Sequence, residues 1–210
     1  MEHQFWHEKW EADDLGFHRD DFNPVLLRHW GDLDIPADGR VFVPLCGKSR
    51  DMAWLMELGH NVLGVELSEV AARSFFEESR LVAVRDEVGP FVRYRSDRVE
   101  IYCGDFFLLE QALLSDVVAV YDRASLIALP AGVRTEYTDR MRTLLRPGVW
   151  MLLITLTYQD GQINPPPFRV YNDEVLTLYQ PWCELEVLEQ SETVVKGYTC
   201  PQSAFRLRVK

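Results

Sequence analysis

The two residues of this sequence that most clearly could bind a ligand lie at the ends of two successive apolar runs. Gly47 lies in the run VFVPLCGKS, and Glu66 ends the run VLGVE about one strand–helix–strand unit later. A glycine turn lets a helix N-terminus approach a polar ligand, and an acid after the second strand can accept hydrogen bonds from ribose hydroxyls. The spacing predicts a nucleoside-binding half-site, and it is equally compatible with a turn and a helix cap that bind nothing.

The glycine content of the turn separates the possible nucleosides. Pyrophosphate-binding loops carry G-x-G-x-x-G, whereas Gly47 is flanked by Cys46 and Lys48. S-adenosylmethionine contains adenosine without phosphate, so a glycine-poor turn followed by an acid suits it better than NAD or FAD. An NAD-dependent oxidoreductase and a noncatalytic nucleoside-cofactor-binding protein remain the alternatives at this point.

Further candidate site residues follow the later apolar runs, because ligands of doubly wound folds bind at the carboxyl ends of strands. Asp105 and Phe106 could hold an adenine by a hydrogen bond and a ring contact. Asp122 and Arg123 close the apolar run VVAVY and form either a ligand clamp or an ion-pair network. The buried strand end favours the clamp, in which the Arg123 guanidinium offers a charged fork to a carboxylate or heterocycle.

A sheet must bring these strand ends together. After residue 40 the sequence alternates apolar β-branched runs with helical patterns, which is typical of an α/β fold with helices on both faces of a parallel sheet. The predicted strands are 40–46, 61–66, 99–103, 117–122, 149–156, 183–191 and 204–210, and the predicted helices are 48–58, 69–79, 107–114, 131–145 and 172–180. Only residues 196–203 separate the last two strands, so we expect these to be antiparallel.

The first 39 residues are predicted to form an aromatic-rich helical extension of a single domain, 1–210, whose α/β core is 40–210. Trp6 and Trp10 are four residues apart, so they share one face of a helix and could cover a sulfonium ligand. Docking of the extension onto the sheet explains the same pair without any ligand.

Composition argues against several classes of protein. The net charge of −11 disfavours a nucleic-acid partner. The four cysteines show no C-x-x-C pair and no metal-ligand spacing with histidine, so reduced thiols and no metal site are expected. No apolar run approaches the ~20 residues of a membrane span, and the N-terminus does not read as a signal peptide. We expect a soluble, cytoplasmic protein without a membrane partner, and a monomer.

Several of these runs together resemble the thiopurine S-methyltransferase family, especially its bacterial members. The similar segments are WHEKW, VFVPLCGKSRDM, GHNVLGVELS, YCGDFF, YDRASLIAL and PPPFRV, from about Trp6 to the end of the chain. The resemblance implies a Rossmann-like class I methyltransferase fold, with a mostly parallel seven-stranded sheet that ends in an antiparallel hairpin strand, and S-adenosyl-L-methionine as cofactor. It implies cofactor contacts from Trp10, Leu45, Glu66 and Arg123, with Trp6, Asp105 and Phe106 nearby.

The activity implied by this resemblance is methyl transfer to the sulfur of a thiopurine or related heterocyclic thiol, and bacterial relatives are also associated with selenium and tellurium compounds. Phe17 and Arg123 would contact the acceptor. An acidic thiol needs no dedicated base, so no catalytic residue is assigned beyond an electrostatic role for Arg123.

Two features leave the acceptor side open. Mammalian members carry a further arginine near the last loop, where Lys196 is the nearest cation in this chain. The run NPPPF at 164–168 is similar to the Asn-Pro-Pro-aromatic loop of amino-group methyltransferases, but it follows the fifth predicted strand instead of the fourth. We therefore expect the 164–169 loop to lie over the acceptor pocket, and N-methylation is disfavoured.

Overall fold

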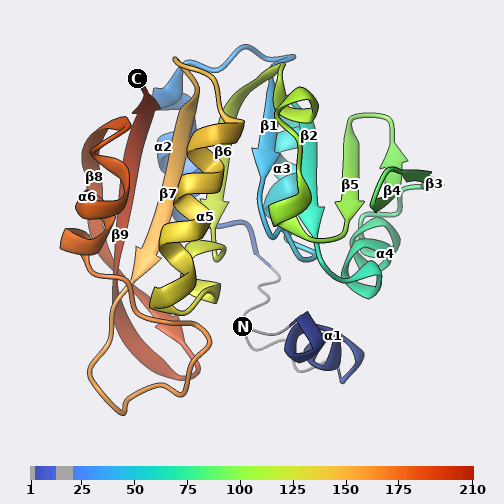
Figure 1. Ribbon diagram of the computed structural model, residues 1–210. Helices are drawn as coiled ribbons and strands as arrows, with labels where there is room; N and C mark the ends of the chain where they lie inside the picture. The colour runs from blue at the N-terminus through green and yellow to red at the C-terminus, as the bar shows by residue number, and fades with distance from the viewer. Residues whose placement is uncertain (1–2, 13–20) are drawn as a thin grey trace.

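One twisted sheet organises the part of the chain that the computed structural model describes, residues 3–12 and 21–210 (Figure 1). Its nine strands in the described residues lie in the order β3-β4-β5-β2-β1-β6-β7-β9-β8. They are β1 (Arg40–Val43), β2 (Asn61–Glu66), β3 (Val84–Val88), β4 (Phe91–Ser96), β5 (Val99–Cys103), β6 (Val117–Arg123), β7 (Trp150–Leu156), β8 (Cys183–Val195) and β9 (Tyr198–Val209). The five central strands, β5-β2-β1-β6-β7, are mutually parallel, and only β4 and β9 run against them.

Helices cover both faces of this sheet, as the apolar alternation predicts. They are α1 (His3–Glu11), α2 (Pro24–His29), α3 (Asp51–Glu57), α4 (Glu69–Glu78), α5 (Ala131–Leu144) and α6 (Asn172–Tyr179). One core cluster joins the sheet to α5 and α6, and a second joins its other face to α2, α3 and α4. The central strands are buried along almost their whole length because both of their faces are covered.

The extension is attached to the core by buried polar contacts. The Asp51 carboxylate accepts hydrogen bonds from the Asn23 backbone N–H at 2.8 Å and from the Tyr121 hydroxyl at 2.9 Å. The Trp30 indole N–H donates to His60 Nε2 at 2.9 Å. Helix α1 lies beyond the carboxyl ends of the central strands and contacts α4 (Figure 1). The extension therefore brings α1 to the edge of the sheet where the predicted site residues lie.

Three details of the predicted elements are wrong. Strands β3 and β4 were not predicted, because β3 is an exposed, charged edge strand and β4 is only partly buried, so neither is a strongly apolar run. Residues 107–114 form two short 3₁₀ turns, Phe106–Leu108 and Gln111–Leu114, because the chain is extended at Leu109. The last two strands continue through residues 196–203 as one long hairpin, turning at Lys196–Gly197.

Candidate active site

A cavity of about 270 Å³ opens at the carboxyl ends of the central parallel strands. The eight cofactor residues predicted from the sequence all line it: Trp6, Trp10, Leu45, Gly47, Glu66, Asp105, Phe106 and Arg123. Phe17, the predicted acceptor contact, lies outside the described residues. Segments separated by more than 100 residues thus meet here, as expected for a doubly wound sheet.

Glu66, at the end of β2, is a buried side chain of the cavity wall that backbone donors hold in place. Its Oε2 accepts a hydrogen bond from the Gly47 backbone N–H at 2.8 Å, and its Oε1 accepts one from the Ser68 N–H at 3.0 Å. Burial raises the pKa of Glu66, although these backbone donors favour the charged form. Each carboxylate oxygen has a second lone pair, so Glu66 can also accept hydrogen bonds from two ligand hydroxyls.

The turn after β1 requires glycine at residue 47 for two reasons. Its φ of +54° lies in the left-handed region, and a Cβ there would lie 3.2 Å from a ring carbon of Trp10. Leu45, two residues earlier, also has a positive φ of 44°. A non-glycine residue held in this region is a local strain of the kind that clusters at functional sites.

Trp10 both docks helix α1 onto the core and faces the cavity. Its side chain is buried, its ring packs over Gly47, and it also lines the cavity. It therefore fixes α1 to the core and forms part of the ligand-facing wall at the same time. Trp6, one helical turn earlier, lines the same cavity and is less buried.

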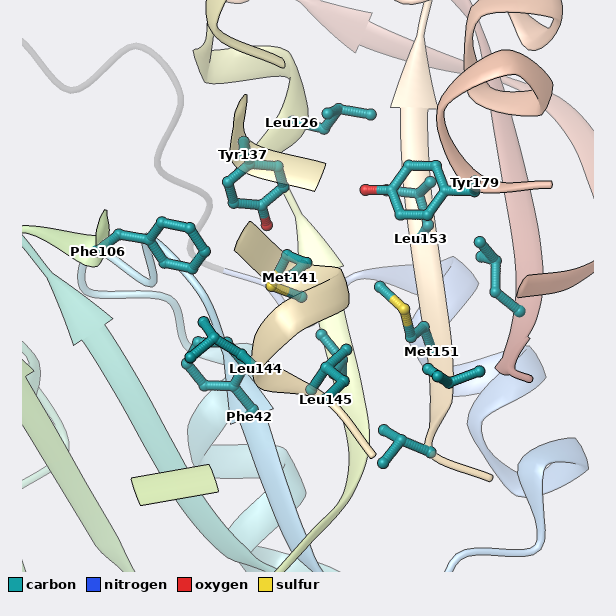
Figure 2. Close-up of a cluster of buried hydrophobic side chains, with 14 of the residues drawn as sticks. Phe42, Phe106, Leu126, Tyr137, Met141, Leu144, Leu145, Met151, Leu153 and Tyr179 are labelled. Atoms are coloured by element: carbon teal, nitrogen blue, oxygen red, sulfur yellow. The ribbon is translucent and has the colours of Figure 1, made fainter. Parts of the chain in front are cut away.

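Asp105 and Phe106 differ in how far they face the cavity. The Asp105 side chain accepts a hydrogen bond from the Phe107 backbone N–H at 2.9 Å and so caps the first 3₁₀ turn. Phe106 is buried, with its ring 4.9 Å from that of Tyr137, and Figure 2 shows it pointing into the apolar cluster beneath α5. Only part of the Phe106 side chain can contact a ligand.

Asp122 and Arg123, at the end of β6, do not form the ion-pair network considered from the sequence. Successive strand residues face opposite sides of a sheet, and Asp122 turns into the core. There it accepts a hydrogen bond from the Tyr137 hydroxyl at 2.7 Å, and burial raises its pKa to about 6. Arg123 lines the cavity and has no hydrogen bond or ion pair with any described residue. Its guanidinium is available to a ligand.

The far end of the cavity comes from the proline loop, which was expected over the acceptor pocket, and from a hairpin that the sequence did not assign to the site. Pro166 and Pro167 lie in the loop between β7 and α6, and the β8–β9 hairpin adds Gln202 and residues 193–195. Lys196, expected as a cation near the acceptor, instead donates hydrogen bonds to backbone carbonyls of the proline loop. A Lys-Gly pair between β-branched residues was the available signal for a hairpin reaching this far.

The chemistry available at the cavity is binding and orientation. The Cys46 thiol lies beside the turn, but burial holds its pKa well above the usual value, so it is not a thiolate nucleophile. Within residues 3–12 and 21–210, no group of three or more histidine, cysteine or acidic side chains could hold a metal ion. No helix in those ranges is long and apolar enough to cross a membrane.

Solved structures with the same fold define the class. The Burkholderia thailandensis 1,6-didemethyltoxoflavin-N1-methyltransferase, determined with S-adenosylhomocysteine, superposes with a TM-score of 0.68 at 15% identity, over 99% of this chain and 87% of that one. The magnesium protoporphyrin IX methyltransferase of Synechocystis, also with bound S-adenosylhomocysteine, gives a TM-score of 0.68 at 11% identity, over 99% and 100% of the two chains. The fold is that of the class I S-adenosylmethionine-dependent methyltransferases.

Sequence similarity then gives the family. The family model of thiopurine S-methyltransferase matches residues 1–206. The thiopurine S-methyltransferase of Pseudomonas fluorescens (strain SBW25) is 49% identical over 94% of this chain and 91% of its own length, and that of Marinobacter nauticus is 46% identical over 85% and 82%. This chain belongs to the thiopurine S-methyltransferase family. It is a methyltransferase enzyme, and S-adenosylmethionine is its methyl donor.

The cavity suits this cofactor. Glu66 has free acceptor lone pairs for ribose hydroxyls, and the turn at Gly47 lacks the glycines that a pyrophosphate needs. Trp10 and Trp6 add aromatic faces, which attract a cationic group such as a sulfonium.

Proposed function

We propose that this protein transfers the methyl group of S-adenosylmethionine to the sulfur of a thiopurine or a related heterocyclic thiol. The observation that supports this most is the division of the cavity into two ends. One end holds the buried Glu66 carboxylate, and the other is lined by prolines and valines. Arg123 is the only cation among the described residues that line the cavity.

The cofactor end is proposed to comprise Trp6, Trp10, Leu45, Gly47, Glu66, Asp105 and Phe106, together with Arg123. In this proposal Glu66 accepts the ribose hydroxyls, and Asp105 with the part of Phe106 that lines the cavity holds the adenine. Glu66 is already oriented by two backbone donors, so little reorganisation is needed on binding.

The acceptor end is proposed to hold a flat, apolar ring whose sulfur is ionised. When bound, the cofactor supplies an electrophilic methyl group on a sulfonium. Arg123 favours the thiolate form of the acceptor electrostatically, and the apolar lining excludes water that would solvate that anion. A heterocyclic thiol is acidic enough to ionise in part at neutral pH, so the proposal needs no dedicated base.

Paired acceptors test the atom that is methylated. Calorimetry should first show binding of S-adenosylhomocysteine and no binding of NAD, because an NAD-dependent enzyme is the alternative. Radiolabelled methyl transfer is then measured to 6-thioguanine and guanine, and to thiophenol and phenol. We expect label only on the two thiols. Label on guanine or phenol at the same rate, or NAD binding alone, would contradict the proposal.

The same soft-nucleophile chemistry extends to selenium and tellurium. A selenol is more acidic than the matching thiol, so benzeneselenol should be methylated at least as fast as thiophenol at neutral pH. Tellurite belongs in the same screen, because the resemblance to the bacterial members of the family implies a soft chalcogen nucleophile.

A further inference from the structure

Two segments far apart in the sequence meet over the acceptor end of the cavity. Pro166 and Pro167 belong to the loop of residues 157–171, and Val194 and Val195 belong to the β8–β9 hairpin. All four residues line the cavity. The distance between this loop and the hairpin therefore determines the width of the acceptor end.

The loop lacks the backbone donors that normally join two such segments. Residues 165–167 are three consecutive prolines, and none of them has an N–H group. Their carbonyl oxygens can still accept hydrogen bonds from a neighbouring segment. Lys196, at the tip of the hairpin, donates hydrogen bonds to this loop: its Nζ lies 2.8 Å from the carbonyl oxygens of Asn164 and of Pro166.

The backbone at the hairpin tip makes a lysine an unusual choice there. Lys196 and Gly197 have φ values of +50° and +81°, the left-handed conformation that a two-residue hairpin turn requires. Asparagine, aspartate or glycine is the usual residue at the first of these positions, because other side chains are disfavoured at positive φ. The two carbonyl contacts made by the Lys196 ammonium give a reason for lysine that the turn itself does not.

A backbone bond from the Thr157 N–H to the Pro201 carbonyl, at 2.8 Å, joins the start of the loop to the hairpin, and other bonds hold the proline end of the loop. The Tyr158 hydroxyl donates to the Pro167 carbonyl at 2.7 Å, and the Phe168 N–H donates to the Ile127 carbonyl at 2.6 Å. These last two bonds tie the loop to its own base and to the 3₁₀ turn Leu126–Ala128. The Lys196 bonds link it across the cavity mouth to the hairpin.

We propose that Lys196 is a positioning residue for the methyl acceptor: it fastens the proline loop to the hairpin and so sets the width of the acceptor end. The inference rests on the proposed function and adds a residue to it. Lys196 acts on the acceptor through the loop and does not touch the cofactor end, so its loss should raise the acceptor KM and leave cofactor affinity unchanged.

The test compares Lys196→Met, which keeps the aliphatic stem, with Lys196→Arg, which restores a donor. Lys210→Met is the matched control, because Lys210 also donates to a backbone carbonyl, that of Gln180, and does not line the cavity. We expect the KM for 6-thioguanine to rise roughly tenfold in Lys196→Met, to recover to within about threefold in Lys196→Arg, and to stay unchanged in Lys210→Met. The Kd for S-adenosylhomocysteine, measured by calorimetry, should be the same in all four proteins.

Amide hydrogen exchange of residues 157–171 provides a readout that needs no turnover. Protection of this loop should fall in Lys196→Met and not in Lys210→Met. Unchanged protection, or lower protection with an unchanged acceptor KM, would overturn the positioning role. Failure of the wild-type protein to methylate any thiol would instead overturn the proposed function, and hydrogen exchange would still show whether the Lys196 contact holds the loop.

Discussion

The two ends of the cavity are built in different ways. At the cofactor end, Glu66 is oriented by backbone N–H groups on the turn after β1 and just beyond its own strand end, and Glu66 and Ser68 are buried. At the acceptor end, the proline loop meets the hairpin through the exposed Lys196 side chain. Strand ends are fixed by the sheet, whereas the loop and hairpin are fixed by a few side-chain contacts.

This difference separates a rigid subsite from an adjustable one. A change in the sheet beneath the cofactor end should cost stability and cofactor binding together, because the same backbone provides both. A change at the acceptor end should alter kinetics with little loss of stability. Substitutions at each end test this difference.

The largest effect is expected from Gly64→Ala, in the middle of β2. A Cβ at Gly64 would lie 2.7 Å from Cys46 Sγ and 3.3 Å from an Ile101 side-chain carbon, both in the closed core. Overpacking of this kind costs about 3 kcal/mol and would push the chain next to Gly47 out of place. Urea unfolding should show the loss of stability, and calorimetry should show weak or absent binding of S-adenosylhomocysteine.

Gly132→Ala is the control for that substitution. Gly132 lies in α5, and a Cβ there would meet nothing within 4 Å. We expect a gain in stability of about 0.5–1 kcal/mol, because alanine reduces the entropy of the unfolded chain. Equal stability of the two variants would show that the core beneath the cofactor end can relax, and the proposed rigidity of this end would be wrong.

Glu66→Ala should have the next largest effect, on binding more than on folding. It removes the proposed ribose acceptor and leaves the Gly47 and Ser68 N–H groups without their partner. We expect the Kd for S-adenosylhomocysteine to rise about 100-fold, which is the loss in affinity expected when a charged hydrogen-bonding group is removed.

Glu69→Ala provides the comparison, because Glu69 pairs with Tyr94 and Arg85 and does not line the cavity. Its cofactor affinity should equal that of the wild-type protein. If Glu66→Ala bound S-adenosylhomocysteine as tightly as Glu69→Ala did, Glu66 would have no part in the cofactor site.

Arg123→Met removes the cation that is proposed to serve both the cofactor end and the acceptor end. We expect turnover to fall about tenfold at pH 7, because the thiolate loses a charge-assisted partner. The deficit should shrink as pH rises and the acceptor ionises without help. The melting temperature should not change, since Arg123 has no hydrogen bond or ion pair within the described part of the chain. Arg142→Met, an exposed change in the last turn of α5, should affect neither quantity.

The sequence brought together residues that line one cavity because these residues obey a local rule. Glu66, Asp105 and Arg123 each end or follow an apolar strand, and parallel strands bring their carboxyl ends to one edge. The five central strands were found for the same reason, since burial on both faces leaves a continuous apolar run.

The acceptor end could not be predicted in this way. Val194 and Val195 reach the cavity only because β8 and β9 extend well beyond the end of β7, and that length depends on pairing between distant residues. The contact of Lys196 with the proline loop is likewise absent from any local pattern. The edge strand β3 and its partly buried neighbour β4 were missed because both carry charges instead of an apolar run.

The smallest expected effect concerns pH and the buried carboxyl beneath the acceptor end. Burial raises the pKa of Asp122 to about 6, so the folded protein binds a proton there at a pH at which the unfolded chain does not. The contribution of Asp122 to stability must therefore increase as pH falls, by about 1 kcal/mol between pH 7 and pH 5. Other groups titrate in this range, so the measurement is the difference in unfolding free energy between the wild-type protein and Asp122→Asn at each pH. The wild-type protein should gain stability relative to Asp122→Asn as the pH falls. A constant difference would mean that Asp122 stays ionised, and that the core beneath Arg123 is more polar than its contact with Tyr137 implies.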